Sequence, residues 1–105
     1  MRIIVLFNLK PGVDVAAYEA WAKTRDMPTV RGLASIARFD VFAATGLLMG
    51  EGQPPFAYYE MIEVADPDQF GRDVATEAMG RISAEFREFA DNPTFVLLRD
   101  LGAGA

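Results

Sequence analysis

The sequence predicts an α+β domain in which strands and helices follow the order β-α-β-β-α-β. First, the chain has 105 residues, 51% of them hydrophobic, which suits one domain with one core. Second, apolar strand patterns occupy residues 2–9, 35–44, 56–65 and 94–98. Third, two helical patterns, each preceded by a capping aspartate, lie between these strands. This order is typical of the ferredoxin-like fold, a four-stranded antiparallel sheet with helices on one face.

The strand at residues 2–9 is apolar on both faces, which predicts a central position in the sheet. Pro11 and Gly12 form the following turn, and Asp14 is a suitable N-cap. We predict a helix over residues 15–26 that ends near Pro28, because a proline disfavours helical conformation in the residue before it. Helical spacing places five of its residues on one face: Val15, Tyr18, Trp21, Ala22 and Arg25.

Alternation along residues 35–44 places Phe39 and Val41 on one face of the sheet. The other face is predicted to carry Ile36, Arg38, Asp40 and Phe42. The connection at residues 45–55 contains Leu47-Leu48-Met49, which fits either a mobile lid over an apolar ligand or an arm that reaches across a dimer. In the strand at residues 56–65, one face carries Phe56, Tyr58, Glu60, Ile62 and Val64, and the other carries Tyr59, Met61 and Glu63.

The second helical region begins at Asp66-Pro67, an N-cap followed by a proline at the first helical position. Gly71 and Gly80 indicate two helical pieces or close packing. A core stripe is predicted from the spacing of Ala75, Met79, Ile82, Phe86 and Phe89. Asp91-Asn92-Pro93 ends the helix, and we expect the tail at residues 101–105 to fray. Residues 1–105 therefore form a single domain.

Helices on one face leave the other face of the sheet bare, and the strands are apolar on both sides. A large bare apolar face indicates a partner. We expect a second copy, packed sheet against sheet in a symmetric homodimer, which is the architecture of a dimeric α+β barrel.

Composition excludes several functions. The chain carries a net charge of −5 and contains no histidine and no cysteine. We therefore expect no nucleic-acid partner, no membrane partner, no metal and no cofactor, and the chain cannot build catalytic sites that need histidine or cysteine. The first residues do not resemble a signal peptide, so we expect a cytoplasmic location.

Several segments together resemble the REDY-like family. They are residues 3–13 (IIVLFNLKPGV), 18–22 (YEAWA), 28–33 (PTVRGL), 45–48 (TGLL) and Phe86 to Pro93 (F-x-x-F-A-D-N-P). Members are small proteins encoded beside biosynthetic genes for prodigiosin-type pyrrole pigments and related aromatic metabolites. The resemblance implies a homodimer with a pocket between sheet and helices, and it supplies no catalytic residues.

The resemblance also implies a function in secondary metabolism without a cofactor. The protein would bind a hydrophobic heteroaromatic intermediate, of pyrrole, carbazole or quinone type, and assist cyclisation, isomerisation or proton transfer. Two alternatives remain: a non-catalytic carrier for such a ligand, and a metal-free monooxygenase.

Six residues are candidates for the site. We expect Glu60, Tyr58 and Tyr18 to be catalytic, since a carboxylate or phenol can move a proton and burial raises the pKa of a carboxylate. Glu60 could instead pair with Arg38, and Tyr18 could be ordinary core packing.

We expect Asn8, Trp21 and Arg31 to bind the ligand, by hydrogen bonding, stacking and anion or carbonyl recognition respectively. The alternatives are that Asn8 satisfies the turn after its strand, Trp21 packs in the core, and Arg31 pairs with Asp26 or caps its helix.

Overall fold

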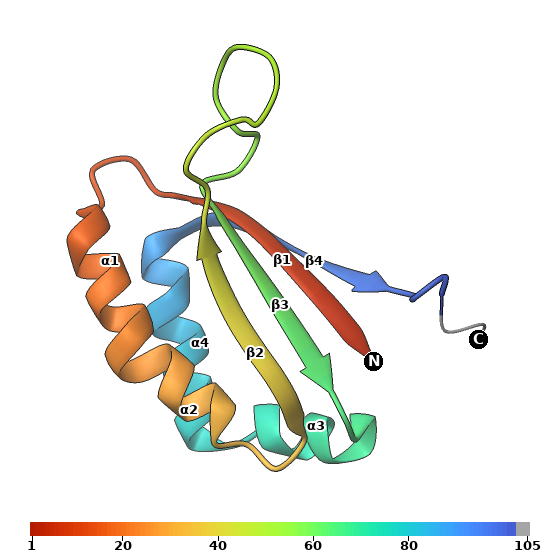
Figure 1. Ribbon diagram of the computed structural model, residues 1–105. Coiled ribbons are helices and arrows are strands. Elements are labelled where there is room, and N and C mark those ends of the chain that lie inside the picture. Colours follow the sequence, from red (N-terminus) through yellow and green to blue (C-terminus); the bar gives the residue numbers. More distant parts are fainter. Residues whose placement is uncertain (103–105) are drawn as a thin grey trace.

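A computed structural model describes residues 1–102 and confirms the predicted fold (Figure 1). The strands are β1 (Arg2–Leu9), β2 (Ile36–Ala43), β3 (Tyr58–Val64) and β4 (Ala90–Leu98). They form one antiparallel sheet in the order β2-β3-β1-β4, so β1 is central as predicted. Residues 103–105 of the tail that we expected to fray lie outside the described residues.

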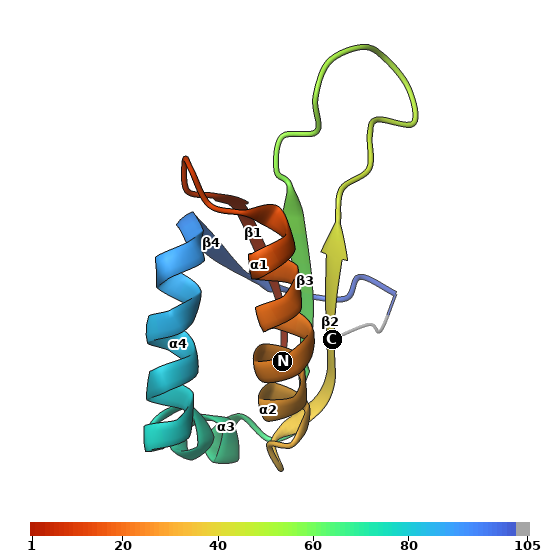
Figure 2. The same ribbon diagram turned by 90° about the vertical axis from the view of Figure 1, so that its left-hand side faces the viewer.

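The helical segments are α1 (Val15–Trp21), the π-helix η1 (Ala22–Asp26), α2 (Met27–Arg31), α3 (Pro67–Val74) and α4 (Glu77–Phe89). The helices α1, α2 and α4 lie on one side of the sheet (Figure 2). The core lies between this helical layer and the sheet, where Val5, Phe7 and Tyr18 are fully buried. The apolar alternation of β1 and the helical stripe of α4 therefore meet in one core.

The prediction that the first helix ends near Pro28 is wrong. The helix continues to Arg31 through a π-helical turn, in which the N–H of Met27 donates to the carbonyl of Ala22. Proline has no N–H to donate, and its ring crowds the carbonyl four residues earlier. A single wider turn relieves this crowding and lets the helix continue with Pro28 in the first turn of α2.

The wider turn also changes which residues face the sheet. In a regular helix Arg25, seven residues after Tyr18, would share its face. The π-helix rotates less per residue, so Asp26 is buried in that place and Arg25 is exposed. Val15, also expected on the inner face, is exposed.

The second helical region forms two pieces, which was one of the two interpretations of Gly71 and Gly80. The pieces meet at Thr76, whose hydroxyl caps α4 by accepting from the N–H of Met79.

Two other features differ from the predictions. The strand β4 begins at Ala90 instead of residue 94. The residues expected to end the helix, Asp91-Asn92-Pro93, therefore lie inside the strand, where Asn92 has a positive φ of 44° and the pairing with β1 shifts register. A second register shift, in β2, turns Ile36 to the helical side, where it packs against the core beside Phe39.

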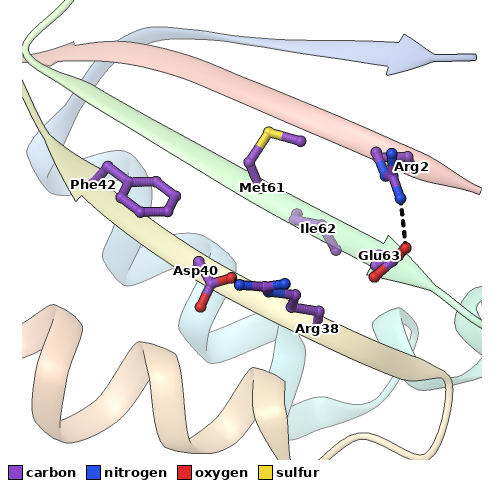
Figure 3. A pocket seen from close by; sticks show the side chains of 7 residues that line it. All are labelled: Arg2, Arg38, Asp40, Phe42, Met61, Ile62 and Glu63. Atoms are coloured by element: carbon purple, nitrogen blue, oxygen red, sulfur yellow. Dashed lines mark hydrogen bonds and ion pairs between the residues drawn. The ribbon is translucent and has the colours of Figure 1, made fainter. Parts of the chain in front are cut away.

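The face of the sheet away from the helices is open in this single chain (Figure 3). Its apolar residues include Ile4, Leu6, Phe42, Tyr59, Met61 and Val96. One end of this face is charged: Arg2 pairs with Glu63 at 2.6 Å, and Arg38 pairs with Asp40.

Residues 44–57, which we call the β2–β3 arm, extend beyond the end of the sheet (Figures 1 and 2). Leu48 and Met49 near its tip are 99% and 83% exposed. The arm leaves β2 at Ala43, whereas Ile36 and Phe39 line the cavity described below from the first half of that strand. The arm therefore starts at the end of β2 away from the part of the strand that lines this cavity.

Within residues 1–102, the helices are all too short or too polar to cross a lipid bilayer.

Candidate active site in an apolar cavity

A cavity of about 210 Å³ lies between the sheet and the helices. Fourteen residues from β2, β3, β4, η1, α2, α3, α4 and the segment before β2 line it. They are Asp26, Val30, Leu33, Ile36, Phe39, Glu60, Ile62, Phe70, Val74, Met79, Ile82, Ser83, Phe86 and Phe95. Eleven of these are hydrocarbon or thioether side chains, so the two carboxyl groups lie in apolar surroundings.

Glu60 is the first of these carboxyl groups. It lies on the helical side of β3, is 5% exposed, and within residues 1–102 its Oε2 atom has no hydrogen-bond partner. Burial, together with the negative charge of Asp26, raises the pKa of Glu60 to about 8. The alternative that Glu60 pairs with Arg38 is wrong, because Arg38 lies on the open face and pairs with Asp40.

Asp26 is the second carboxyl group, and we did not predict its role. The π-helical turn buries it to 5% exposure, and burial raises its pKa to about 7. The signal in the sequence was Pro28, since a proline inside an amphipathic helical pattern requires an irregular turn just before it. Local irregularities of this kind are frequent at functional sites.

Tyr18 lies beside this pair but lines a different cavity. Its hydroxyl is buried without a hydrogen-bond partner in the described chain, and burial, followed by the charges of Glu60 and Asp26, raises its pKa. It lines a second cavity of about 210 Å³ together with Glu19 and Tyr58. The ring centroids of Tyr18 and Tyr58 are 4.8 Å apart.

Tyr58 is held by Glu19. Its hydroxyl donates to Glu19 Oε2 at 2.8 Å, and burial and this hydrogen bond raise the pKa of Tyr58 to about 12. Tyr58 therefore has a partner and lines the second cavity, while Glu60 lines the first.

Trp21 is in the core and does not line the first cavity. Its Nε1–H donates to Glu85 Oε1 at 2.7 Å, and Arg25 donates to both oxygens of Glu85. The donors Arg25 and Trp21 hold the pKa of Glu85 down at about 2. This arrangement fastens the first helix to α4, so the packing interpretation of Trp21 fits the structure.

Asn8 and Arg31 also lie outside the cavity. Asn8 is exposed, and its Oδ1 accepts from the N–H of Ala57 at 2.8 Å, which ties the base of the β2–β3 arm to β1. Arg31 donates to the carbonyl of Phe39 at 2.9 Å and pairs with Asp40, so it joins α2 to β2. These contacts differ from the alternatives considered above, which were the turn after β1 for Asn8, and Asp26 or the end of its helix for Arg31.

A larger depression of about 290 Å³ lies on the open face of the sheet (Figure 3). Its four charged side chains form two ion pairs, Arg2 with Glu63 and Arg38 with Asp40. The cavity that contains Asp26 and Glu60 is the better candidate site, because within residues 1–102 the Oε2 atom of Glu60 is buried there without a hydrogen-bond partner. The part of the chain that the structure describes holds no cluster of three or more acidic residues able to bind a metal ion.

Comparison with solved structures supports the fold. The crystal structure of HapK from Hahella chejuensis is 25% identical, with a TM-score of 0.70, and the match covers 94% of this chain and 93% of that chain. An ethyl tert-butyl ether d (EthD) family protein from Bacillus halodurans is 18% identical, with a TM-score of 0.71 and coverage of 95% and 97%. A dimeric ferredoxin-like protein of unknown function from Thermobifida fusca is 16% identical, with a TM-score of 0.71 and coverage of 90% and 85%.

Comparison with curated protein sequences gives no significant match. A family model described as REDY-like protein HapK matches residues 1–101. This match confirms the resemblance seen in the sequence, and it spans the sheet, the helices and both carboxyl groups of the cavity. The chain belongs to the REDY-like HapK family.

Proposed function

We propose that the protein binds a hydrophobic heteroaromatic intermediate of secondary metabolism in this cavity and assists its cyclisation, isomerisation or proton transfer. The observation that carries the proposal is the pair of buried carboxyl groups, Asp26 and Glu60, in an apolar cavity. Apolar walls with a few convergent polar groups of shifted pKa are typical of sites for small molecules.

The pair is suited to acid–base work near neutral pH. With the pKa values of Asp26 and Glu60 raised to about 7 and 8, the pair carries a proton that it can donate and retains a group that can accept one. A ring closure or tautomerisation needs one proton removed and another returned, and both steps fit two neighbouring carboxyl groups. The surrounding hydrocarbon surface holds the ligand and excludes water.

The dimer is part of the same proposal. Relatives of this fold are described as dimeric, and the open sheet face with its row of apolar residues suits a second copy. The β2–β3 arm, with Leu48 and Met49 exposed, would contact that second copy.

Native mass spectrometry of the protein purified from its own host tests binding. We expect a dimer that carries a conjugated aromatic adduct, and the adduct identifies the ligand for a turnover assay. In that assay Glu60→Gln abolishes turnover while the fold and the dimer persist. Glu63→Gln is the matched control, since Glu63 lies on the same strand but on the opposite face.

The same assay separates the alternatives. Saturable binding without product formation identifies a carrier. Oxygen uptake during turnover identifies a metal-free monooxygenase. Equal turnover by Glu60→Gln and the wild type removes Glu60 from the mechanism.

A further inference from the structure

The polar groups that residues 1–102 contribute to the cavity are acidic or neutral, and none of them is basic. Among the described residues that line it, the polar side chains are Asp26, Glu60 and Ser83, and none is lysine, arginine, asparagine or glutamine. Arg31, the cation on the neighbouring turn of α2, donates instead to the backbone of β2. The cavity therefore offers acidic oxygens and one hydroxyl, with no fixed positive charge.

The Glu60 carboxyl group lacks a donor. Its Oε2 atom is buried without a hydrogen-bond partner within residues 1–102, although Glu60 is only 5% exposed. A buried acceptor without a donor is unfavourable, so a ligand that supplies a donor to this atom is favoured in the cavity. A carboxylate without a partner favours a positively charged donor most strongly.

The groups around Glu60 add no compensating charge. Asp26 approaches from η1 and Tyr18 from α1, Tyr58 neighbours it on β3, and Ser83 lines the cavity from α4. Beyond Tyr58 lies Glu19, another acid. An anionic ligand would meet only negative or neutral groups here, whereas a cation would favour ionisation of both carboxyl groups.

The cavity volume restricts the ligand further. About 210 Å³ is below the range of roughly 300–1,000 Å³ that encloses drug-sized ligands. Phe39, Phe86 and Phe95 contribute aromatic surface to the walls. A compact bicyclic ring therefore suits the cavity better than an extended conjugated chain.

From these contacts we infer that the ligand is a compact apolar ring system bearing a positively charged nitrogen, which binds beside Glu60 and Asp26. This inference rests on the proposed function, because it assigns the ligand class of the same cavity. Binding of the cation releases the proton held by the carboxyl pair, since the neighbouring positive charge stabilises both ionised forms. In the bound state the positively charged N–H of the ligand then serves as the acid, and the two carboxylates serve as the bases.

Three probes share one ring and differ in charge: 2-naphthylmethylamine, a cation at neutral pH, 2-naphthalenemethanol, which is neutral, and the anion 2-naphthoate. Isothermal titration calorimetry with the full chain at pH 7.5 measures each affinity. We expect the amine to bind at least tenfold more tightly than the alcohol and 2-naphthoate not to bind. Titrations of the amine in buffers of different ionisation enthalpy should show proton release, and those of the alcohol should not.

Variants locate the effect. We expect Glu60→Gln to weaken amine binding about tenfold and to change alcohol binding less than twofold. Asp26→Asn provides a second test from another element should Glu60→Gln fold poorly. Glu63→Gln, on the open face, should bind all three probes like the wild type.

The outcomes distinguish this inference from the proposed function. Equal affinity for the amine and the alcohol, or tighter binding of 2-naphthoate, overturns the positively charged ligand and leaves the aromatic cavity intact. Failure of all three probes to bind overturns the ligand class and the proposed function together.

Discussion

Asp26 and Glu60 line the same apolar cavity, and the charge of Asp26 helps to raise the pKa of Glu60. One comes from a π-helical turn and the other from the strand β3, next to the central strand of the sheet. Their proximity depends on both elements: the alternation of β3 turns Glu60 toward the helices, and the π-helix turns Asp26 toward the sheet.

The pair predicts a decline of stability with rising pH. A carboxyl group whose pKa is raised by folding stabilises the protein below its unfolded pKa, and this stability is lost as pH rises through the folded pKa. The window therefore runs from about pH 4 to about pH 8. Urea unfolding should give a free energy of unfolding that falls by on the order of 2 kcal/mol or more between pH 5 and pH 8.

Substitution at Glu60 provides the control for that measurement. Glu60→Gln removes one titrating group, so its stability should decline less steeply than that of the wild type, while Glu63→Gln should follow the wild type. If the free energy of unfolding of the wild type rises between pH 5 and pH 8, Asp26 and Glu60 are not buried in their protonated forms.

Substitution of Pro28, which does not line the cavity, should change the orientation of Asp26, which does. In Pro28→Ala, a backbone N–H becomes available and the reason for the π-helical turn disappears. We expect a regular helix that rotates Asp26 toward solvent and returns its pKa toward the ordinary value. NMR titration of the Asp26 carboxyl carbon measures this, and an unchanged, raised pKa would show that packing and not Pro28 maintains the π-helix.

Asn8→Ala and Asn8→Asp should differ in how much stability they lose. Its Oδ1 accepts from the N–H of Ala57, so Asn8→Ala should lower the free energy of unfolding by about 1 kcal/mol. Asn8→Asp retains an acceptor at this position and should lose less. Denaturant unfolding compares the two, and amide exchange at Ala57 should accelerate only in Asn8→Ala. Equal losses would indicate that the hydrogen bond contributes nothing.

The open sheet face predicts a homodimer. Met61 lies in the middle of this face, so Met61→Asp places a charge where the second copy would pack and should give a folded monomer of 11.5 kDa. Val15→Asp makes the same change at an exposed position on the helical side, and it should remain a dimer of twice that mass. Light scattering after gel filtration measures both, and a monomeric wild type would refute the prediction.

The sequence by itself determined the fold, because the alternation of β1 and β3 and the caps Asp14 and Asp66 are local signals that do not depend on long-range contacts. It also identified Glu60 as a candidate, since period-two alternation assigns a residue to one face of a sheet.

Only the tertiary structure decided which face was buried and what met there. The hydrogen-bond partners of Asn8, Trp21 and Arg31 cannot be read from the local sequence pattern. In the structure they are Ala57, Glu85 and Phe39 respectively, each on a different element of the fold. We did not predict Asp26 because the period of a regular helix puts Arg25, and not Asp26, on the face toward the sheet. A single π-helical turn changes that period, and its effect appears only when the helix packs against the sheet.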